Sequence, residues 1–290
     1  MGDRAAQIKD WVKERPYLEE IAGLHETIAA AIEENAAPEP ESDSAGVDQA
    51  PAVEELKKGV PLLRAVEAGE AIIAHAAGLL EAMTAALVKA SPTEEIKGHA
   101  SRAQGAFQKQ AALPGQVVAE VLETGTLQQG KESLGEIDEG FIVFLTWSAL
   151  SGALEPLQRQ LAELLEEHTW RRGYCPLCGH LPAMGYLFHT ERGKGRERDL
   201  VCGCCRMRWR YKRIGCPYCD NTEQGQLNII GLDDEPELRI DTCDRCKAYL
   251  KTYMGEGKEE VALADWSTLH LDLVAKEKGF KRSGHRMYTL

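Results

Sequence analysis

Four Cys-x-x-Cys pairs constrain this chain more than any other feature of its sequence. All nine cysteines lie in one region, and eight of them form the pairs Cys175/Cys178, Cys202/Cys205, Cys216/Cys219 and Cys243/Cys246. A Cys-x-x-Cys turn can direct two thiolates at one metal ion, and two such turns complete a tetrahedron with metal–sulfur distances of about 2.3 Å. The eight residues are therefore predicted to be the ligands of two four-cysteine metal sites.

The spacing of the pairs indicates an internal repeat with an offset of 41 residues. Residues 179–201 separate the first two pairs and residues 220–242 separate the last two, which is 23 residues in each case. A duplication predicts sequential pairing, in which the first and second pairs share one metal ion and the third and fourth pairs share another. A cross-braced arrangement, with the first pair joined to the third, is the alternative.

Disulfides and redox dithiols fit these cysteines less well than metal ions do. A chain of 290 residues can bury a core without disulfides. A catalytic dithiol usually opens a helix in an α/β setting, which this region lacks, and repeated pairs in a reducing compartment are typical of metal sites. Four thiolates suit zinc, which would be structural, and also iron, which could carry one electron. The spacing does not distinguish the two metals.

Three other residues of this region could take part in its chemistry. Cys204 has no partner in the pairing, and its basic neighbours would lower the thiol pKa, although a spectator role is the simpler interpretation. His180 and His189 could ligate zinc, but eight cysteines already fill two sites. We find no Ser-His-Asp series, P-loop or His-Glu-x-x-His motif, so no catalytic or cofactor-binding residue is predicted.

Outside the cysteine region, the chain is predicted to be helical before the first cysteine and to have a short helical tail after the last one. Helical periodicity runs to about Arg172, and strands are expected at Met184–Phe188, Trp209–Tyr211 and Leu227–Gly231. Prolines should end or restart helices at Pro16, Pro61, Pro92 and Pro114. The predicted segments are N-terminal helices at 1–35, a flexible acidic and Pro-rich linker at 36–53, a helical bundle at 54–170, four-Cys modules at 171–215 and 216–263, and a C-terminal helix and tail at 264–290.

These segments predict a fold of the class α plus small β. It would hold a helical N-terminal domain, then two tandem rubredoxin-like or zinc-ribbon metal modules, and then a C-terminal helix. The longest mostly apolar stretch, Phe141–Leu154, has 14 residues, whereas a membrane helix needs about 20. We therefore expect it to be a buried core helix. The N-terminus lacks an apolar signal core, so a cytoplasmic protein without membrane insertion is expected.

Charge is distributed unevenly along the chain. The formal net charge of -12 argues against a protein that binds nucleic acid over its whole surface. Residues 171–213 are nevertheless basic, with nine Arg and two Lys against three acids. Two interpretations are open: compensation of the charge on four metal-bound thiolates, or a surface for a partner or nucleic acid.

Motifs around the cysteines carry a family resemblance. They are Trp170-Arg-Arg-Gly-Tyr-Cys-Pro-Leu-Cys-Gly-His-Leu-Pro182, the order of the four pairs, Cys243-Asp-Arg-Cys-Lys-Ala-Tyr-Leu-Lys251 and Asp265-Trp-Ser-Thr-Leu-His-Leu-Asp272. Together they resemble the formate dehydrogenase accessory protein FdhE family over about Trp170–Phe280. The helical half is similar mainly in its helical character.

The resemblance implies a helical domain joined to two rubredoxin-like modules whose eight cysteines bind iron. It also implies a non-enzymatic, cytoplasmic role in the maturation of a respiratory formate dehydrogenase, through binding of the catalytic subunit. No family role attaches to Cys204. Two alternatives stay open: a zinc-ribbon nucleic-acid binder, suggested by the basic first module and Trp209, and a rubredoxin-like one-electron carrier. Homo-oligomerisation is also open.

Overall fold

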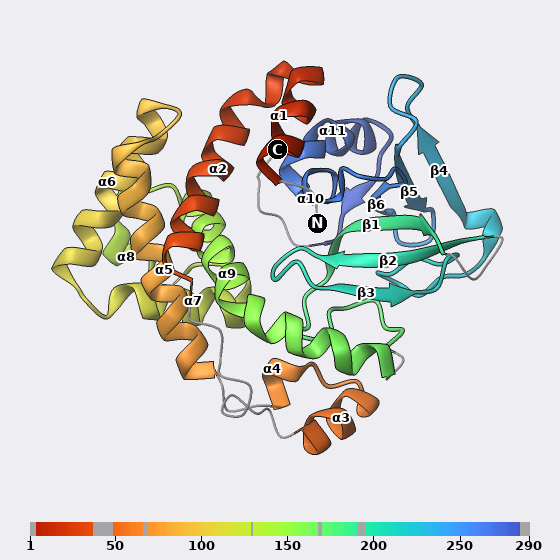
Figure 1. Ribbon diagram of the computed structural model, residues 1–290, viewed down its shortest axis with the longest axis horizontal. Coiled ribbons are helices and arrows are strands. Elements are labelled where there is room, and N and C mark those ends of the chain that lie inside the picture. Colours follow the sequence, from red (N-terminus) through yellow and green to blue (C-terminus); the bar gives the residue numbers. More distant parts are fainter. Residues whose placement is uncertain are drawn as a thin grey trace.

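The chain folds into a helical side and a sheet side that meet along the longest helix (Figure 1). The computed structural model describes residues 4–36, 49–65, 69–128, 130–167, 170–190 and 195–284. Its α-helices are α1 (Arg4–Glu14), α2 (Glu19–Glu34), α3 (Gln49–Lys58), α4 (Leu62–Ala65), α5 (Gly69–Lys89), α6 (Glu94–Lys109), α7 (Leu113–Thr124), α8 (Lys131–Leu134), α9 (Glu139–Glu167), α10 (Glu259–Ala262) and α11 (Leu269–Glu277). Short 3-10 turns, η1 (Pro16–Leu18), η2 (Gln224–Gln226) and η3 (Asp265–Thr268), complete the helical elements.

Helix boundaries follow the signals expected from the sequence. Pro16 begins η1, and Pro114 lies in the first turn of α7. Backbone N–H groups of a first turn have no partner within the helix, so a proline there removes no hydrogen bond. The Thr93 hydroxyl caps α6 by accepting a hydrogen bond from the N–H of Ile96 at 3.3 Å. Of the predicted linker 36–53, residues 37–48 lie outside the described residues. Helix α3 begins at Gln49, inside the range predicted as linker.

The core of the helical side is formed by α5 packing against α9, with α2, α6 and α7 around them. Two stretches, α5 and residues 139–159 of α9, are long and apolar enough to cross a membrane. Their apolar residues instead fill this core: Leu80, Met83, Ile142 and Leu145 have no exposed surface. The apolar stretch within α9 is thus the buried core helix that the sequence predicts.

The sheet side is one continuous seven-stranded sheet rather than two separate small sheets. Its strands are β1 (Pro182–His189), β2 (Arg196–Cys202), β3 (Arg208–Tyr211), β4 (Leu227–Gly231), β5 (Leu238–Cys243), β6 (Ala248–Tyr253) and β7 (Lys281–Arg282). Their order is β3-β2-β1-β6-β5-β4, and β7 pairs with β6. All three predicted strands are present, whereas β2, β5, β6 and β7 were not predicted.

The internal repeat is visible in the strands. β1, β2 and β3 of the first four-Cys module correspond in order to β4, β5 and β6 of the second, with antiparallel pairing inside each module. The modules join where β1 pairs in parallel with β6, at Met184 opposite Lys251. The predicted fold class is therefore confirmed, with the added finding that the tandem modules share a sheet.

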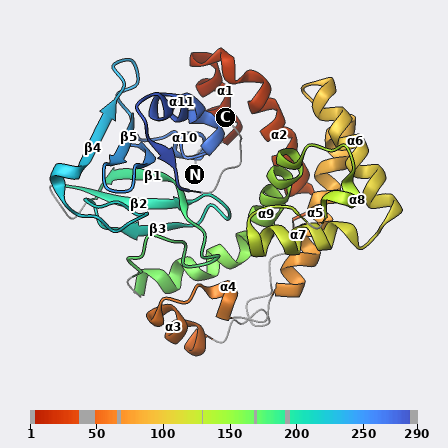
Figure 2. The same cartoon turned by 180° about the vertical axis from the view of Figure 1, so that it is seen from behind.

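One face of the sheet is covered by elements from both ends of the chain (Figures 1 and 2). Helix α1 lies against α10, and the Trp11 indole N–H donates to the carbonyl of Ser267 at 3.2 Å. Trp11 and Trp266 share a buried cluster with Leu238 and Ile240 of β5. Helix α2 continues from this cluster to α5. The N-terminal helices thus bridge the sheet and the helical side.

The opposite face packs toward the helical side. Leu200 of β2 and Trp209 of β3 belong to the same buried cluster as the core residues of α5 and α9. The Gln158 side chain of α9 also donates a hydrogen bond to the carbonyl of Cys205. The first four-Cys module therefore shares its core with the helices.

A buried ionic cluster fixes the C-terminal tail to β6. Lys251, only 1% exposed, contacts Asp265 at 2.7 Å and Asp272 at 2.8 Å. Arg282 of β7 contacts the same two carboxylates at 2.8 and 3.2 Å. Burial alone would raise the pKa of Asp265, but Lys251 and Arg282 outweigh it and lower that pKa to about 2. Two cations and two anions thus compensate one another within one buried cluster.

We expect Lys251→Met to destabilise the protein by about 3–5 kcal/mol, because it leaves two buried carboxylates with one cation. Lys57→Met is the matched control: Lys57 is exposed and pairs with Glu54 one helical turn away, so its loss should cost about 0–1 kcal/mol. Urea unfolding followed by circular dichroism measures both. Equal effects of the two substitutions would contradict the structural role of the cluster.

Candidate metal centres

Eight cysteines gather into two groups of four, as sequential pairing predicts. In each group the four sulfur atoms lie within 4.8 Å of one another. The first group holds Cys175, Cys178, Cys202 and Cys205, and the second holds Cys216, Cys219, Cys243 and Cys246. The cross-braced alternative is excluded by this arrangement.

Each Cys-x-x-Cys pair forms a tight turn of the same kind. The N–H of Gly179 donates to the carbonyl of Cys175 at 3.0 Å, and the equivalent bond joins Asp220 to Cys216 at 3.0 Å. The residue after each second cysteine has a positive φ, at Gly179, Arg206, Asp220 and Lys247. Left-handed backbone is uncommon for residues other than glycine. Its recurrence at four equivalent positions shows that all four Cys-x-x-Cys turns end in the same backbone conformation.

The sulfur separations match a tetrahedral thiolate cage. Cys175 and Cys205 are 3.5 Å apart at sulfur, and Cys178 and Cys202 are 3.4 Å apart. In the second group, the sulfurs of Cys216 and Cys246 are separated by 3.6 Å. Metal–sulfur bonds of about 2.3 Å give sulfur–sulfur edges of about 3.8 Å in a regular tetrahedron. The cages therefore need only slight expansion to hold an ion.

The first cage is buried within the core shared with the helices. Cys175 and Cys205 have no exposed surface. The start of α4 contacts the first turn directly, because the N–H groups of Leu62 and Leu63 donate to the carbonyls of Pro176 and Leu177, each at 2.9 Å. No sequence pattern predicts this contact between segments more than 100 residues apart.

The second cage lies toward the β4 edge and is more open. Cys219 and Cys246 are only partly buried, whereas Cys216 and Cys243 are buried. The side-chain amide of Asn221 approaches the Cys243 sulfur at 3.7 Å. The two cages have the same donor set but different access to solvent.

Burial opposes the ionisation of the thiols, and hydrogen bonds offset it at some of them. It raises the pKa of Cys175 and of Cys205 well above the ordinary value, because a thiolate without a cation is unfavourable in a dry core. At Cys243 burial also opposes ionisation, but backbone N–H groups of the turn and the Asn221 amide lower the pKa to about 7. A divalent cation would favour the thiolate form at all eight positions.

The other three residues lie outside the cages. Cys204 is 1% exposed, and burial raises the pKa of its thiol well above the ordinary value. The lowered pKa expected from its basic neighbours is therefore wrong, because the thiol is desolvated and lies beside the cysteines of the first cage, which raise its pKa further. The ring of His180 packs edge-on against Trp147, and His189 accepts a hydrogen bond from Arg196. Neither histidine belongs to a four-sulfur group.

The aromatic and glycine residues of the first motif hold the cage in place. The Trp170 indole donates to the carbonyl of Tyr174 at 2.8 Å, and the Trp209 indole donates to the carbonyl of Arg172 at 2.9 Å. A β-carbon at Gly173 would lie 1.9 Å from the carbonyl oxygen of Pro217. Only glycine allows this close approach between the first motif and the third Cys pair.

Known proteins are similar to parts of this chain in sequence and to its fold. Residues 214–288 match the family described as FdhE, C-terminal domain. The FdhE homolog of Aquifex aeolicus is 32% identical over 131 residues, 44% of this chain and 46% of the relative. The crystal structure of the FdhE protein from Pseudomonas aeruginosa matches with a TM-score of 0.69 at 22% identity, over 97% of this chain and 92% of that one. By sequence the chain is similar to FdhE proteins over part of its length, and by fold it is similar to the Pseudomonas aeruginosa FdhE protein over nearly its whole length.

The sequence matches span only part of the FdhE relatives. The FdhE homolog of Haemophilus ducreyi is 33% identical over 141 residues, which are 48% of this chain and 45% of the relative. The chain thus aligns with less than half the length of these curated relatives. The structural match, by contrast, extends over the helical side as well and shows that the two chains have the same fold.

We expect two metal ions per chain after anaerobic purification, because each group of four sulfurs forms a closed tetrahedron. Replacing Cys216 and Cys219 by serine should remove one ion and leave the other. Elemental analysis by mass spectrometry, normalised to protein by amino-acid analysis, measures the ratio. One ion per unmodified chain would contradict two independent cages.

Loss of the two cages should have unequal effects on stability, because only the first is enclosed in the core shared with the helices. We expect Cys175→Ser with Cys178→Ser to lower the thermal midpoint of the helical circular dichroism signal substantially. Cys216→Ser with Cys219→Ser is the matched control and should leave that midpoint near the wild-type value. Identical shifts would mean that burial of the first cage does not couple it to the helices.

Proposed function

We propose that this protein is a cytoplasmic, non-enzymatic maturation factor for a respiratory formate dehydrogenase and acts by binding the catalytic subunit. The observation that carries the proposal is the pair of four-cysteine cages set in an FdhE fold. The relatives that carry the name FdhE include Protein FdhE of Escherichia coli, which is 32% identical over 146 residues. The choice of a formate dehydrogenase as the partner enzyme rests on the family resemblance.

The eight cysteines would ligate two metal ions in this role. The donor set of four thiolates accepts iron or zinc, and the family resemblance favours iron. A site closed by four protein ligands has no open position for a substrate or a water molecule. Binding of a client, rather than metal-centred hydrolysis, is the activity that such sites support.

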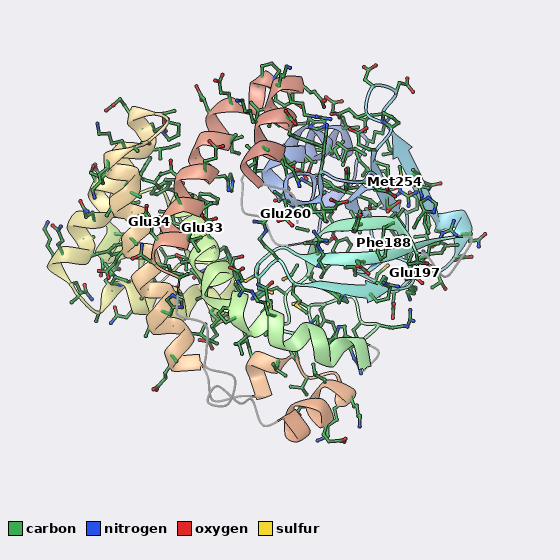
Figure 3. All side chains as sticks on the ribbon, in the orientation of Figure 1. Glu33, Glu34, Phe188, Glu197, Met254 and Glu260 are labelled. Carbon is green, nitrogen blue, oxygen red and sulfur yellow. The ribbon has the colours of Figure 1, made fainter. Side chains whose placement is uncertain are left out.

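Contacts of the basic first module favour a protein client over nucleic acid. Trp209 is buried and hydrogen-bonded, so it cannot stack on a base in this conformation. Arg210 pairs with Glu197 and lies over the ring of Phe188, two residues that face each other at the end of the β1–β2 hairpin (Figure 3). Arg198 is buried. Much of the local positive charge is therefore used within the module.

Deletion of the gene should abolish formate-linked respiration without lowering the transcript of the dehydrogenase, because maturation follows synthesis. The unmodified chain should co-purify with the catalytic subunit from formate-grown cells and restore activity to the deletion strain. Activity staining and affinity purification measure the two results. Normal formate oxidation in the deletion strain, together with absence of the subunit from purified complexes, would overturn the proposed function and leave the metal prediction intact.

A further inference from the structure

A cavity of about 220 Å³ lies beside the second cage, and the proposed function gives it no role. Its lining includes Arg198 of β2 and Arg239 and Asp241 of β5, together with Leu227, Ile229 and Leu250. Ile229 is directly opposite Asp241 in the β4–β5 register, and Leu250 is opposite Asp241 in the β5–β6 register. These residues therefore occupy one face of the second module.

The first guanidinium of the cavity belongs to Arg198, which is 3% exposed. One of its terminal nitrogens donates to the carbonyl of Gly215 at 2.7 Å. Its Nε is buried and has no hydrogen-bond partner among the described residues. Burial lowers the pKa of this arginine, yet a guanidinium stays charged in proteins. A buried donor without a protein partner is costly, so a water molecule or a ligand is expected to accept its hydrogen bond.

The second guanidinium repeats this pattern. Arg239 contacts Asp241 at 2.8 Å through a terminal nitrogen, and its buried Nε also has no partner within the described chain. Asp241 is held in place by a hydrogen bond from the Thr252 hydroxyl at 2.8 Å. The lining thus holds one carboxylate and three guanidinium groups, of which Arg213 carries the third, and the Nε–H donors of Arg198 and Arg239 have no partner among the described residues.

Apolar side chains form the rest of the wall and its outer rim. Ile229 is 61% exposed and Ile214 is 49% exposed, and both line the cavity. They are two of the five large apolar side chains that the described residues expose. Ile229 lies on β4, the edge strand of the sheet. An occupant would therefore meet cations inside and apolar surface outside.

We propose that this cavity binds a carboxylate attached to an apolar group, with the carboxylate between Arg198 and Arg239 and the apolar group against Ile214 and Ile229. Two sources have this chemistry: a free apolar carboxylic acid, and the C-terminal residue of a peptide chain. The arginine N–H groups donate to the carboxylate oxygens, and such charge-assisted bonds are stronger than neutral ones.

The competing explanation is that the arginines only balance the charge of the second cage. Cys216 and Cys243 also line the cavity, and four thiolates around a divalent ion carry a net negative charge. Charge balance predicts loss of metal when an arginine is removed and no saturable binding of a carboxylate. The carboxylate site predicts the reverse.

Binding is tested by isothermal titration of the metal-loaded full chain with N-acetyl-leucine, its neutral amide, and a pentapeptide ending in Ile with a free or an amidated C-terminus. We expect saturable binding of the carboxylate forms and none of the amides. Tighter binding of the peptide than of N-acetyl-leucine would assign the site to a chain end; equal binding would assign it to a free acid.

Variants separate the site from a structural role. Arg239→Met should weaken carboxylate binding at least tenfold while both metal ions are retained, and Arg102→Met, an exposed arginine of α6, is the matched control. Asp241→Asn should tighten binding, since it removes the competing negative charge and keeps an acceptor for Thr252; a damaged fold could not produce this gain. Equal binding of acid and amide, or an unchanged affinity in Arg239→Met, would overturn the proposal, as would metal loss without carboxylate binding.

Discussion

The parallel pairing of β1 with β6 is the constraint on which the rest of the structure depends. Each four-Cys module alone is a three-stranded unit with little to bury, and small units of that kind need a metal or a packing partner. Joining the two modules edge to edge makes one sheet with two large faces. The helices then cover one face, and α1 with the C-terminal tail covers the other. The pairing of β1 with β6 therefore makes the two four-Cys modules part of one larger fold.

The same join makes the two cages unequal, although their sequences repeat. The first cage lies where the sheet meets α9 and α4, so its cysteines are part of the main core. The second is displaced toward the β4 edge and keeps two partly exposed cysteines. The repeated Cys-x-x-Cys spacing accounts for the same set of four cysteines in each cage. The position of each cage in the sheet accounts for its different surroundings. A metal ion would consequently be more accessible to solvent or partners at the second cage.

The local parts of this fold could be predicted from the sequence, and the long-range parts could not. Cys-x-x-Cys spacing gave both groups of four, and strand patterns gave β1, β3 and β4. Strand β2 was not predicted because it begins with the polar run Arg196 to Asp199. The side chains of this run find partners only in the assembled sheet. Trp11 carries no signal that it would pack against Ser267, 256 residues away. Cys204 was misjudged because sequence shows neighbouring charges but not burial.

The cavity beside the second cage follows from the same difference between the surroundings of the two modules. In the first module, Leu200 and Trp209 of the corresponding sheet face are buried against the helical side. In the second module the equivalent face extends past the helices, so Arg239 and Asp241 line a hollow instead of a core. Arg198 lies where the covered part of the face meets the open part, and this explains how it can be almost fully buried and still lack a partner for Nε. The second module, which is uncovered on this face, thus places charged and apolar side chains against two cysteines of its cage.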